Sequence, residues 1–185
     1  MARPVSRAEA VAEAGRVAAA AVGRTVLIGV DGFGGAGKSS LSAMIAGAVP
    51  RAQVVHVDDF ASPRIPEWDW PRFRAQLLLP LLAGQVARYQ VWDWDRDAGG
   101  EWLDVAPGRP VVVEGVSSTR AEVGAPWALT MWVDAPRDVR LRRALERDGE
   151  ALLPRWLADW MPSEDAYAAR ERPQDRVDLI VSGTD

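Results

Sequence analysis

The chain has 185 residues, of which 48 % are hydrophobic and 26 % charged, as expected for one globular domain with a sizeable core. The net charge of −4 is evidence against nucleic-acid binding, and no apolar run approaches the roughly 20 residues needed to cross a membrane. The absence of cysteine removes disulfides and thiolate metal sites and favours a cytoplasmic location, while the single histidine, His56, excludes a histidine-based zinc cluster.

Helix-like and strand-like segments alternate along the chain. Apolar residues recur with a helical period over residues 6–22, so we expect an N-terminal helix within 1–23, preceding the core. Continuous apolar runs suit strands buried on both faces of a parallel sheet, and the alternation predicts a three-layer α/β sandwich forming a single domain, 1–185. The expected strands are Thr25–Val30, Gln53–Val57, Pro110–Val113, Leu129–Val133 and Val177–Val181, and the expected helices after the first are Lys38–Ala48, Trp70–Ala83, Arg137–Asp148 and Leu152–Arg170.

Two segments have a less regular pattern. Pro162 lies inside the last expected helix and could break it, because proline lacks the amide hydrogen that a helix interior uses. The stretch Val86–Pro107 fits no regular period, and we expect either a short hairpin or an ordered surface loop there. No repeat or long linker divides the chain.

The first strand leads into the sequence DGFGGAGKSS, which matches the P-loop pattern in full. Its glycines let successive backbone amides approach phosphate oxygens, and the following helix adds its free N-terminal donors. The only lysine of the chain lies here, where a slim ammonium group reaches the outer phosphates better than the wide guanidinium of arginine. We therefore expect nucleotide binding by Gly32, Gly34, Gly35, Ala36, Gly37, Lys38, Ser39 and Ser40, with the Ser39 hydroxyl on Mg²⁺.

A P-loop by itself does not distinguish kinases from GTPases, motors or transporters. GTPases of the common type read guanine with an Asn-Lys-x-Asp motif, whereas this chain has no asparagine and no lysine besides Lys38. The sequence therefore argues against that class.

Acidic residues follow two of the expected strands, at the sheet edge where open α/β proteins build their sites. Asp58 and Asp59 come directly after Gln53–Val57, and Glu114 follows Pro110–Val113. One such carboxylate can hold Mg²⁺ or its waters, while another accepts the proton of an attacking hydroxyl. The alternative interpretation is that each carboxylate caps a helix or stabilises a turn.

The order of motifs resembles the uridine kinase-like branch of the P-loop nucleoside kinases, and more distantly pantothenate kinase and phosphoribulokinase. The motifs are GVDGFGGAGKSS, HVDDF, WDWPRF, ARYQVWDW, VVVEG and DVRLRRALERD, spread from about Val26 to Gly183. The resemblance implies a five-stranded parallel sheet with a helical, mobile lid, and ATP and Mg²⁺ as cofactors. It also allows self-association into a homo-oligomer.

Several residue roles follow from this resemblance. Asp58 matches the catalytic aspartate that orients and deprotonates the acceptor hydroxyl, and Asp69 matches an aspartate that holds ribose hydroxyls. Trp92 and Trp94 occupy aromatic positions that line the nucleoside site, although the tryptophans could equally pack between the sheet and an irregular flap. The relatives carry a histidine after this segment, where the present chain reads Asp95-Arg96-Asp97.

Three arginines lie where the relatives carry lid and substrate arginines: Arg140, Arg143 and Arg147. Their spacing places them on one helix face, from which they could neutralise phosphate charge. We expect Arg143 and Arg147 at the nucleotide and Arg140 at the acceptor. The alternative is a solvated face with ion pairs to Glu146 or Asp148.

The sequence as a whole predicts a kinase that uses ATP and Mg²⁺ to phosphorylate a small metabolite, most simply a pyrimidine nucleoside. Lys38, Asp58 and Glu114 form the expected catalytic set, and Ser39, Asp58 and Glu114 surround the metal. Two alternatives stay open: a kinase for another alcohol, such as pantothenate, a sugar or an antibiotic-like compound, and a nucleotide-binding regulatory protein without catalysis. No membrane or nucleic-acid partner is expected.

Overall fold

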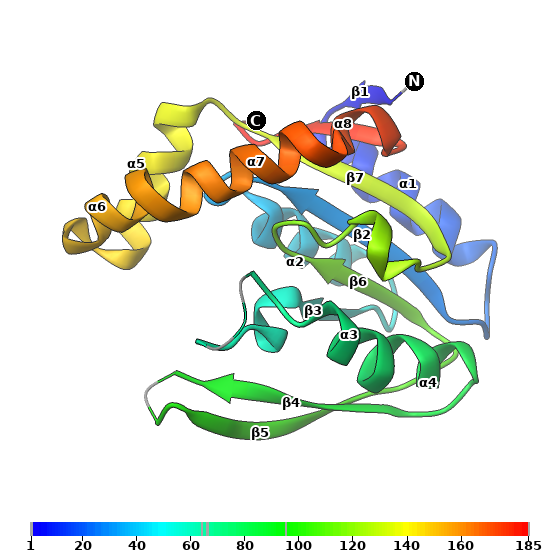
Figure 1. Ribbon diagram of the computed structural model, residues 1–185. Helices are drawn as coiled ribbons and strands as arrows, with labels where there is room; N and C mark the ends of the chain where they lie inside the picture. The colour runs from blue at the N-terminus through cyan, green and yellow to red at the C-terminus, as the bar shows by residue number, and fades with distance from the viewer. Residues whose placement is uncertain (1, 64, 66, 95, 185) are drawn as a thin grey trace.

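A parallel sheet forms the middle layer of the protein, seen in a computed structural model that describes residues 2–63, 65, 67–94 and 96–184 (Figure 1). The order of its six strands is β1-β8-β7-β2-β6-β3, and every neighbouring pair is parallel. The strands are β1 (Arg3–Val5), β2 (Val26–Gly32), β3 (Gln53–His56), β6 (Pro110–Glu114), β7 (Trp127–Asp134) and β8 (Leu179–Ser182).

The predicted count of five strands was wrong by one within the described residues. The additional strand is β1, whose three residues pair with β8 at the edge of the sheet. A run this short carries no periodic signal, so only its pairing with a distant segment defines it as a strand.

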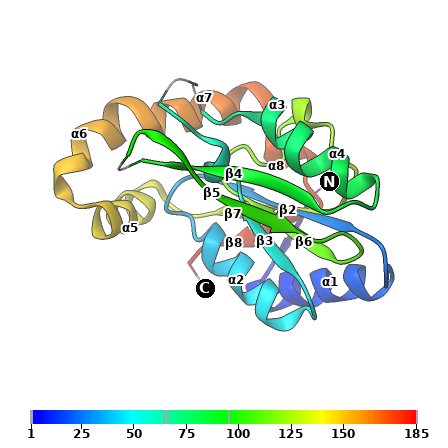
Figure 2. The same ribbon diagram turned by 90° about the horizontal axis from the view of Figure 1, so that it is seen from below.

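Helices cover both faces of the sheet, and Figure 2 shows α1 and α2 on one side and α3, α4 and α7 on the other. The α-helices are α1 (Arg7–Ala19), α2 (Lys38–Ala48), α3 (Trp70–Phe73), α4 (Leu79–Leu82), α5 (Arg137–Asp148), α6 (Leu153–Arg155), α7 (Met161–Glu171) and α8 (Pro173–Arg176). Shorter turns are the 3₁₀ segments η1 (Val57–Phe60), η3 (Ala121–Val123) and η4 (Glu150–Leu152), and the π-helical segments η2 (Arg74–Leu78) and η5 (Trp156–Trp160).

The strands divide their side chains between two cores because successive residues point to opposite faces. On β2, Ile28 packs with Leu41 and Ile45 of α2, whereas Leu27 belongs to the cluster under α3 and α4. The predicted three-layer α/β sandwich is therefore confirmed. Within the described ranges, no helix is both long and apolar enough to span a bilayer.

Two helical stretches continue through an internal proline. Pro162 does not break the last helix, because the wider π turn η5 precedes it, and η2 precedes Pro80 in the same way. A π turn moves aside the carbonyl that would otherwise face the missing amide hydrogen and the ring. The sequence pattern reveals the proline but not this local rewinding.

The segment left open between hairpin and loop is a hairpin. Strands β4 (Ala87–Asp93) and β5 (Ala98–Val105) pair antiparallel, separately from the main sheet. Its inner face packs Tyr89 and Val105 against the cluster that contains Phe60 and Phe73. Phe60 stacks on Tyr89 with ring centroids 4.7 Å apart, which fixes the hairpin against η1.

Candidate active site

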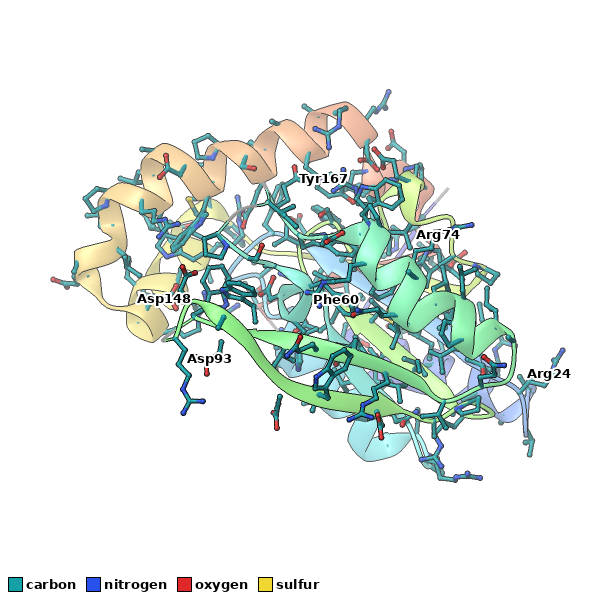
Figure 3. All side chains as sticks on the ribbon, turned by 60° about the horizontal axis from the view of Figure 1, so that its bottom comes forward. Arg24, Phe60, Arg74, Asp93, Asp148 and Tyr167 are labelled. Atoms are coloured by element: carbon teal, nitrogen blue, oxygen red, sulfur yellow. The ribbon has the colours of Figure 1, made fainter. Side chains whose placement is uncertain are left out.

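A cavity of about 780 Å³ lies at the carboxyl ends of β2, β3 and β6. Its walls are the glycine-rich loop, η1, the loop after β6, the α5–α7 segment and the tip of the β4–β5 hairpin. Figure 3 labels Asp148, which lines the cavity from the end of α5, and Asp93, next to the lining residue Trp94. Figure 1 shows α5 and α6 extending beyond the strand ends, where the lid is expected.

Crowding explains the glycines of the loop between β2 and α2. Gly35 has a φ of +72°, and a Cβ there would collide with the carbonyl oxygen of Arg140. Gly37 has a φ of +103°, and a Cβ there would lie 2.5 Å from Nη2 of Arg7. Positive φ and close backing surfaces leave no room for side chains, so the loop presents its main-chain amides to the cavity. Phosphate binding requires such a surface.

The first turn of α2 completes this cradle. The helix has no side-chain hydrogen bond at its N-cap, so its first amides stay available to an anion. Lys38 is almost buried, and its Nζ donates to the carbonyl oxygen of Phe33 at 2.9 Å across the loop. Of the predicted loop residues, Gly32 and Ala36 are buried behind the surface; Gly34, Gly35, Gly37, Lys38, Ser39 and Ser40 line the cavity.

The two acids of the strand ends face this cradle. Asp58 lines the cavity from η1, whereas its neighbour Asp59 accepts a hydrogen bond from the Tyr89 hydroxyl at 2.9 Å on the hairpin side. Glu114 ends β6, and its Oε1 accepts from the Ser39 hydroxyl at 3.1 Å. The structure therefore brings Lys38, Ser39, Asp58 and Glu114 together around one cavity.

Local environment shifts the pKa values of the two acids in opposite directions. Burial raises the pKa of Asp58, and the positive charge of the nearby Lys38 only partly opposes this increase. The negative charge of Glu114 raises the pKa further. Burial also opposes ionisation of Glu114, but the hydrogen bond from His56 and the charge of Lys38 outweigh it and lower the pKa of Glu114. Such a separation suits a pair in which one carboxylate exchanges a proton and the other stays ionised.

The donor set of Ser39 and Glu114 fits Mg²⁺. This ion prefers oxygen ligands and usually combines one or two protein side chains with substrate phosphates and waters. Within the part of the chain that the structure describes, no group of three or more acidic or histidine side chains forms a complete metal cage.

The predicted arginines of α5 divide into two groups. Arg143 and Arg147 line the cavity. Arg143 donates to the carbonyl oxygens of Gly35 at 3.4 Å and Gly183 at 2.8 Å, and Arg147 makes a bidentate pair with Asp148 at 2.6 and 2.9 Å. The predicted ion pairing thus occurs at Arg147, which nevertheless stays at the cavity wall.

Arg140 lies behind the loop rather than at the cavity wall. It is buried, stacks over the Phe33 ring at 4.0 Å, and pairs with Glu164 of α7 at 3.6 Å. Glu164 in turn accepts a hydrogen bond from the Gly34 amide at 3.0 Å, which seats α7 on the loop. From this position Arg140 can support the glycine-rich loop.

The predicted acceptor residues also divide. Trp94 lines the cavity, but Trp92 does not, and its indole nitrogen is buried without a hydrogen-bond partner. Asp69 caps α3 by accepting from the Arg72 amide at 2.9 Å, and it does not line the cavity either. Of the hairpin-tip sequence that replaces the expected histidine, Asp95 lies outside the described residues. Trp127 and Trp132 pack in the apolar clusters.

A network of hydrogen bonds around the buried Asp31 supports the site. Asp31 has no exposed surface and accepts hydrogen bonds from the hydroxyls of Thr119 and Tyr167, each at 2.7 Å. It also accepts from the amides of Gly32, Ser117 and Thr119. This one carboxylate therefore ties the P-loop strand, the loop after β6 and α7 together.

Comparison with known proteins places this architecture. No protein-family model and no curated protein sequence matches the chain. Among solved structures, a possible uridine kinase from Bacillus stearothermophilus matches with a TM-score of 0.70 and 19 % identity over 94 % of this chain and 98 % of that one. A candidate fructose transport system kinase from Silicibacter sp. TM1040 matches with a TM-score of 0.66 and 21 % identity over 92 % of this chain and 98 % of that one. The chain has the fold of the P-loop kinases.

In this P-loop kinase fold, several cavity residues come from segments that carry no motif. Ser117 has a left-handed φ of +60° and accepts a hydrogen bond from the Trp68 indole at 2.9 Å. The other unpredicted residues lie on the lid side, where helical spacing alone gives no sign of what a helix face will meet. The cavity residues that the sequence did not single out include Ser117, Trp156, Trp160, Glu164 and Tyr167.

Proposed function

We propose that this protein is a kinase that transfers the γ-phosphate of ATP, with Mg²⁺, to a hydroxyl group of a small metabolite. The observation that carries the proposal is the convergence of Lys38, Asp58 and Glu114 on one cavity above the glycine-rich loop. A loop that only bound a nucleotide would not require an acid with a raised pKa at the same cavity as the lysine. The two acids therefore favour catalysis over a purely regulatory role.

Each residue has a physical task in this reaction. Asp58 accepts the proton of the acceptor hydroxyl as its oxygen bonds to the γ-phosphorus, and the bond from that phosphorus to the β-phosphate oxygen breaks. Lys38 and the loop amides hold the β- and γ-phosphates, while Arg143 and Arg147 are placed to neutralise charge when the lid closes. Ser39 and Glu114 would hold Mg²⁺, which supplies charge neutralisation at the phosphates.

The acceptor that we propose is a pyrimidine nucleoside. Trp94 is exposed and Trp160 partly exposed at the cavity, and their indole rings offer flat surfaces on which a base could stack, whereas Trp68 and Trp156, which also line it, are largely buried. A similar solved structure is described as a possible uridine kinase, in line with this choice.

A sugar is the second candidate acceptor. One similar structure is described as a candidate fructose transport system kinase. In addition, Asp69 and Trp92, which the family resemblance assigns to a nucleoside, do not line the cavity. Hydroxyls of a sugar could use the polar groups of Ser117, Ser163 and Glu164 at the cavity wall.

Turnover with MgATP and separate panels of nucleosides, sugars and other alcohols tests the proposal. We expect transfer to one class of hydroxyl compound, and we expect Asp58→Asn to lower kcat by ~10²–10⁴ while ATP affinity stays near the wild-type value. Asp59→Asn is the matched control, since this neighbour faces Tyr89 instead of the cavity. Full turnover in Asp58→Asn would refute the base, and ATP binding without transfer to any acceptor would favour the regulatory alternative.

A further inference from the structure

The only histidine of the chain contacts the carboxylate expected at the metal. His56 is the last residue of β3, and the strand register places it directly beside Glu114 of β6. Its Nδ1 lies 2.5 Å from Oε1 of Glu114, the same oxygen that accepts from the Ser39 hydroxyl. The three side chains therefore form a short line from the sheet edge to the first turn of α2.

The exposure of the two partners differs sharply. The Glu114 side chain is 6 % exposed, whereas that of His56 is 49 % exposed because β3 is an edge strand. An imidazole with half of its surface in solvent adds little to the apolar core, so packing does not explain its position. It does not line the cavity either, so it cannot reach the reacting atoms directly.

The chemistry of the contact fixes its direction. An ionised carboxylate only accepts hydrogen bonds, so Nδ1 must carry the hydrogen and donate it to Glu114. This holds whether or not the other ring nitrogen is protonated. The donated bond holds Glu114 in one orientation, and Ser39 and Glu114 together face the side where the phosphates and their metal would lie.

We propose that His56 is a positioning residue for the Mg²⁺ of the nucleotide complex, acting by orienting Glu114 and, through it, the Ser39 hydroxyl. The inference rests on the proposed function, since it takes Ser39 and Glu114 as the metal side of the site. Outer partners of metal ligands commonly contribute ~10–100-fold to metal affinity by this means.

Calorimetry of Mg²⁺ binding tests the proposal without relying on turnover. The wild-type protein, saturated with a non-hydrolysable ATP analogue, is titrated with Mg²⁺. In a second experiment, the analogue is titrated into the protein in the presence of EDTA, which measures its binding without metal. We expect His56→Ala to weaken Mg²⁺ binding ~10-fold or more and to leave metal-free analogue binding unchanged. His56→Asn keeps an N–H donor near the Nδ1 position, and we expect it to restore most of the affinity.

Gln53→Ala is the matched control on the same edge strand. Gln53 is half-buried and bonds the backbone of Ala106 at 2.9 and 3.0 Å, away from Glu114, so its loss should leave the Mg²⁺ affinity unchanged. Turnover adds a second readout, because the rate of His56→Ala should recover when Mg²⁺ is raised to saturation.

Two results would overturn the inference and leave the proposed function standing: wild-type Mg²⁺ affinity in folded His56→Ala, or equal weakening of analogue binding with and without Mg²⁺. A wild-type protein that binds no nucleotide at all would instead refute the proposed function itself, and this inference with it. Thermal unfolding confirms that each variant is folded.

Discussion

At the scale of single residues, the local environment gives chemically similar carboxylates of the site different contacts and different pKa values. Asp58 and Asp59 are adjacent in sequence, yet only Asp58 lines the cavity, whereas Asp59 bonds Tyr89. Asp58 and Glu114 share the cavity, but burial raises the pKa of the first, while His56 and Lys38 overcome burial and lower that of the second. Position in the fold, and not residue type, therefore assigns the roles.

The raised pKa of Asp58 predicts a pH dependence. A base must be deprotonated to act, so kcat/KM should fall as the pH drops through the pKa of Asp58, which lies above the ordinary aspartate value of about 4. The pH profile of kcat/KM in wild type and in Asp58→Asn measures this. The acidic limb should disappear in the variant; an identical limb in both proteins would assign it to another group.

Steric crowding at the loop predicts a second effect. Gly35→Ala would force a Cβ against the Arg140 carbonyl at a positive φ, so we expect the loop to shift and nucleotide affinity to fall at least ~10-fold. Gly47→Ala is the control, because a Cβ there meets nothing within 4 Å on α2 and should stabilise the protein by ~0.5–1 kcal/mol. Titration with an ATP analogue and chemical denaturation measure the two effects, and normal affinity in Gly35→Ala would contradict the cradle geometry.

At the scale of elements, α7 supports the glycine-rich loop. Its Glu164 bonds the Gly34 amide and its Tyr167 bonds the buried Asp31, so one helix contacts both the start and the middle of the glycine-rich segment. The helix reaches both because the π turn η5 carries it past Pro162 without interruption. Helix α7 therefore holds the glycine-rich loop and the buried Asp31 in a fixed relation to each other.

The two tyrosines of the chain provide a matched test of this support. Tyr167→Phe removes a donor to the fully buried Asp31, and we expect the free energy of unfolding to fall by ~1–3 kcal/mol. Tyr89→Phe removes a similar bond to the half-buried Asp59, which water can replace, so its cost should be smaller. Urea denaturation of both variants decides the order, and a larger cost for Tyr89→Phe would contradict it.

At the scale of the whole molecule, the two ends of the chain meet behind the P-loop. Arg7 at the start of α1 donates to the carbonyl oxygens of Ser182 and Gly183 after β8, and to the Ser40 hydroxyl of α2. Gly183 also accepts from Arg143, so α5 shares this contact. The nucleotide cradle thus depends on segments from both ends of the sequence.

Removal of this contact should affect both stability and binding. Arg7→Met keeps most of the aliphatic stem but loses the three hydrogen bonds, and we expect a loss of ~1–3 kcal/mol in unfolding free energy with a several-fold weaker nucleotide affinity. Arg16→Met, in the same helix, loses only an exposed pair with Glu13 and should cost at most ~0.5 kcal/mol. Denaturation and nucleotide titration measure both variants, and equal effects would refute the bridging role.

The sequence by itself determined the fold class, the P-loop and the two strand-end acids of this protein. Buried strands, amphipathic helices and a glycine-rich turn are encoded by neighbouring residues, so their pattern is legible along the chain. The helices Lys38–Ala48 and Arg137–Asp148 have the predicted bounds, and the five predicted strands lie within a residue or two of β2, β3, β6, β7 and β8.

Only the tertiary structure decided which side chains meet. The register of β3 against β6 sets His56 beside Glu114, and the packing of α7 brings Glu164 and Tyr167 to the loop. The same long-range packing keeps Asp69 and Trp92 out of the cavity wall. It also pairs the three residues of β1 with β8 and so makes them a strand. Strand register and helix packing depend on the combined burial of segments that are distant in sequence, so the spacing of neighbouring residues does not predict them.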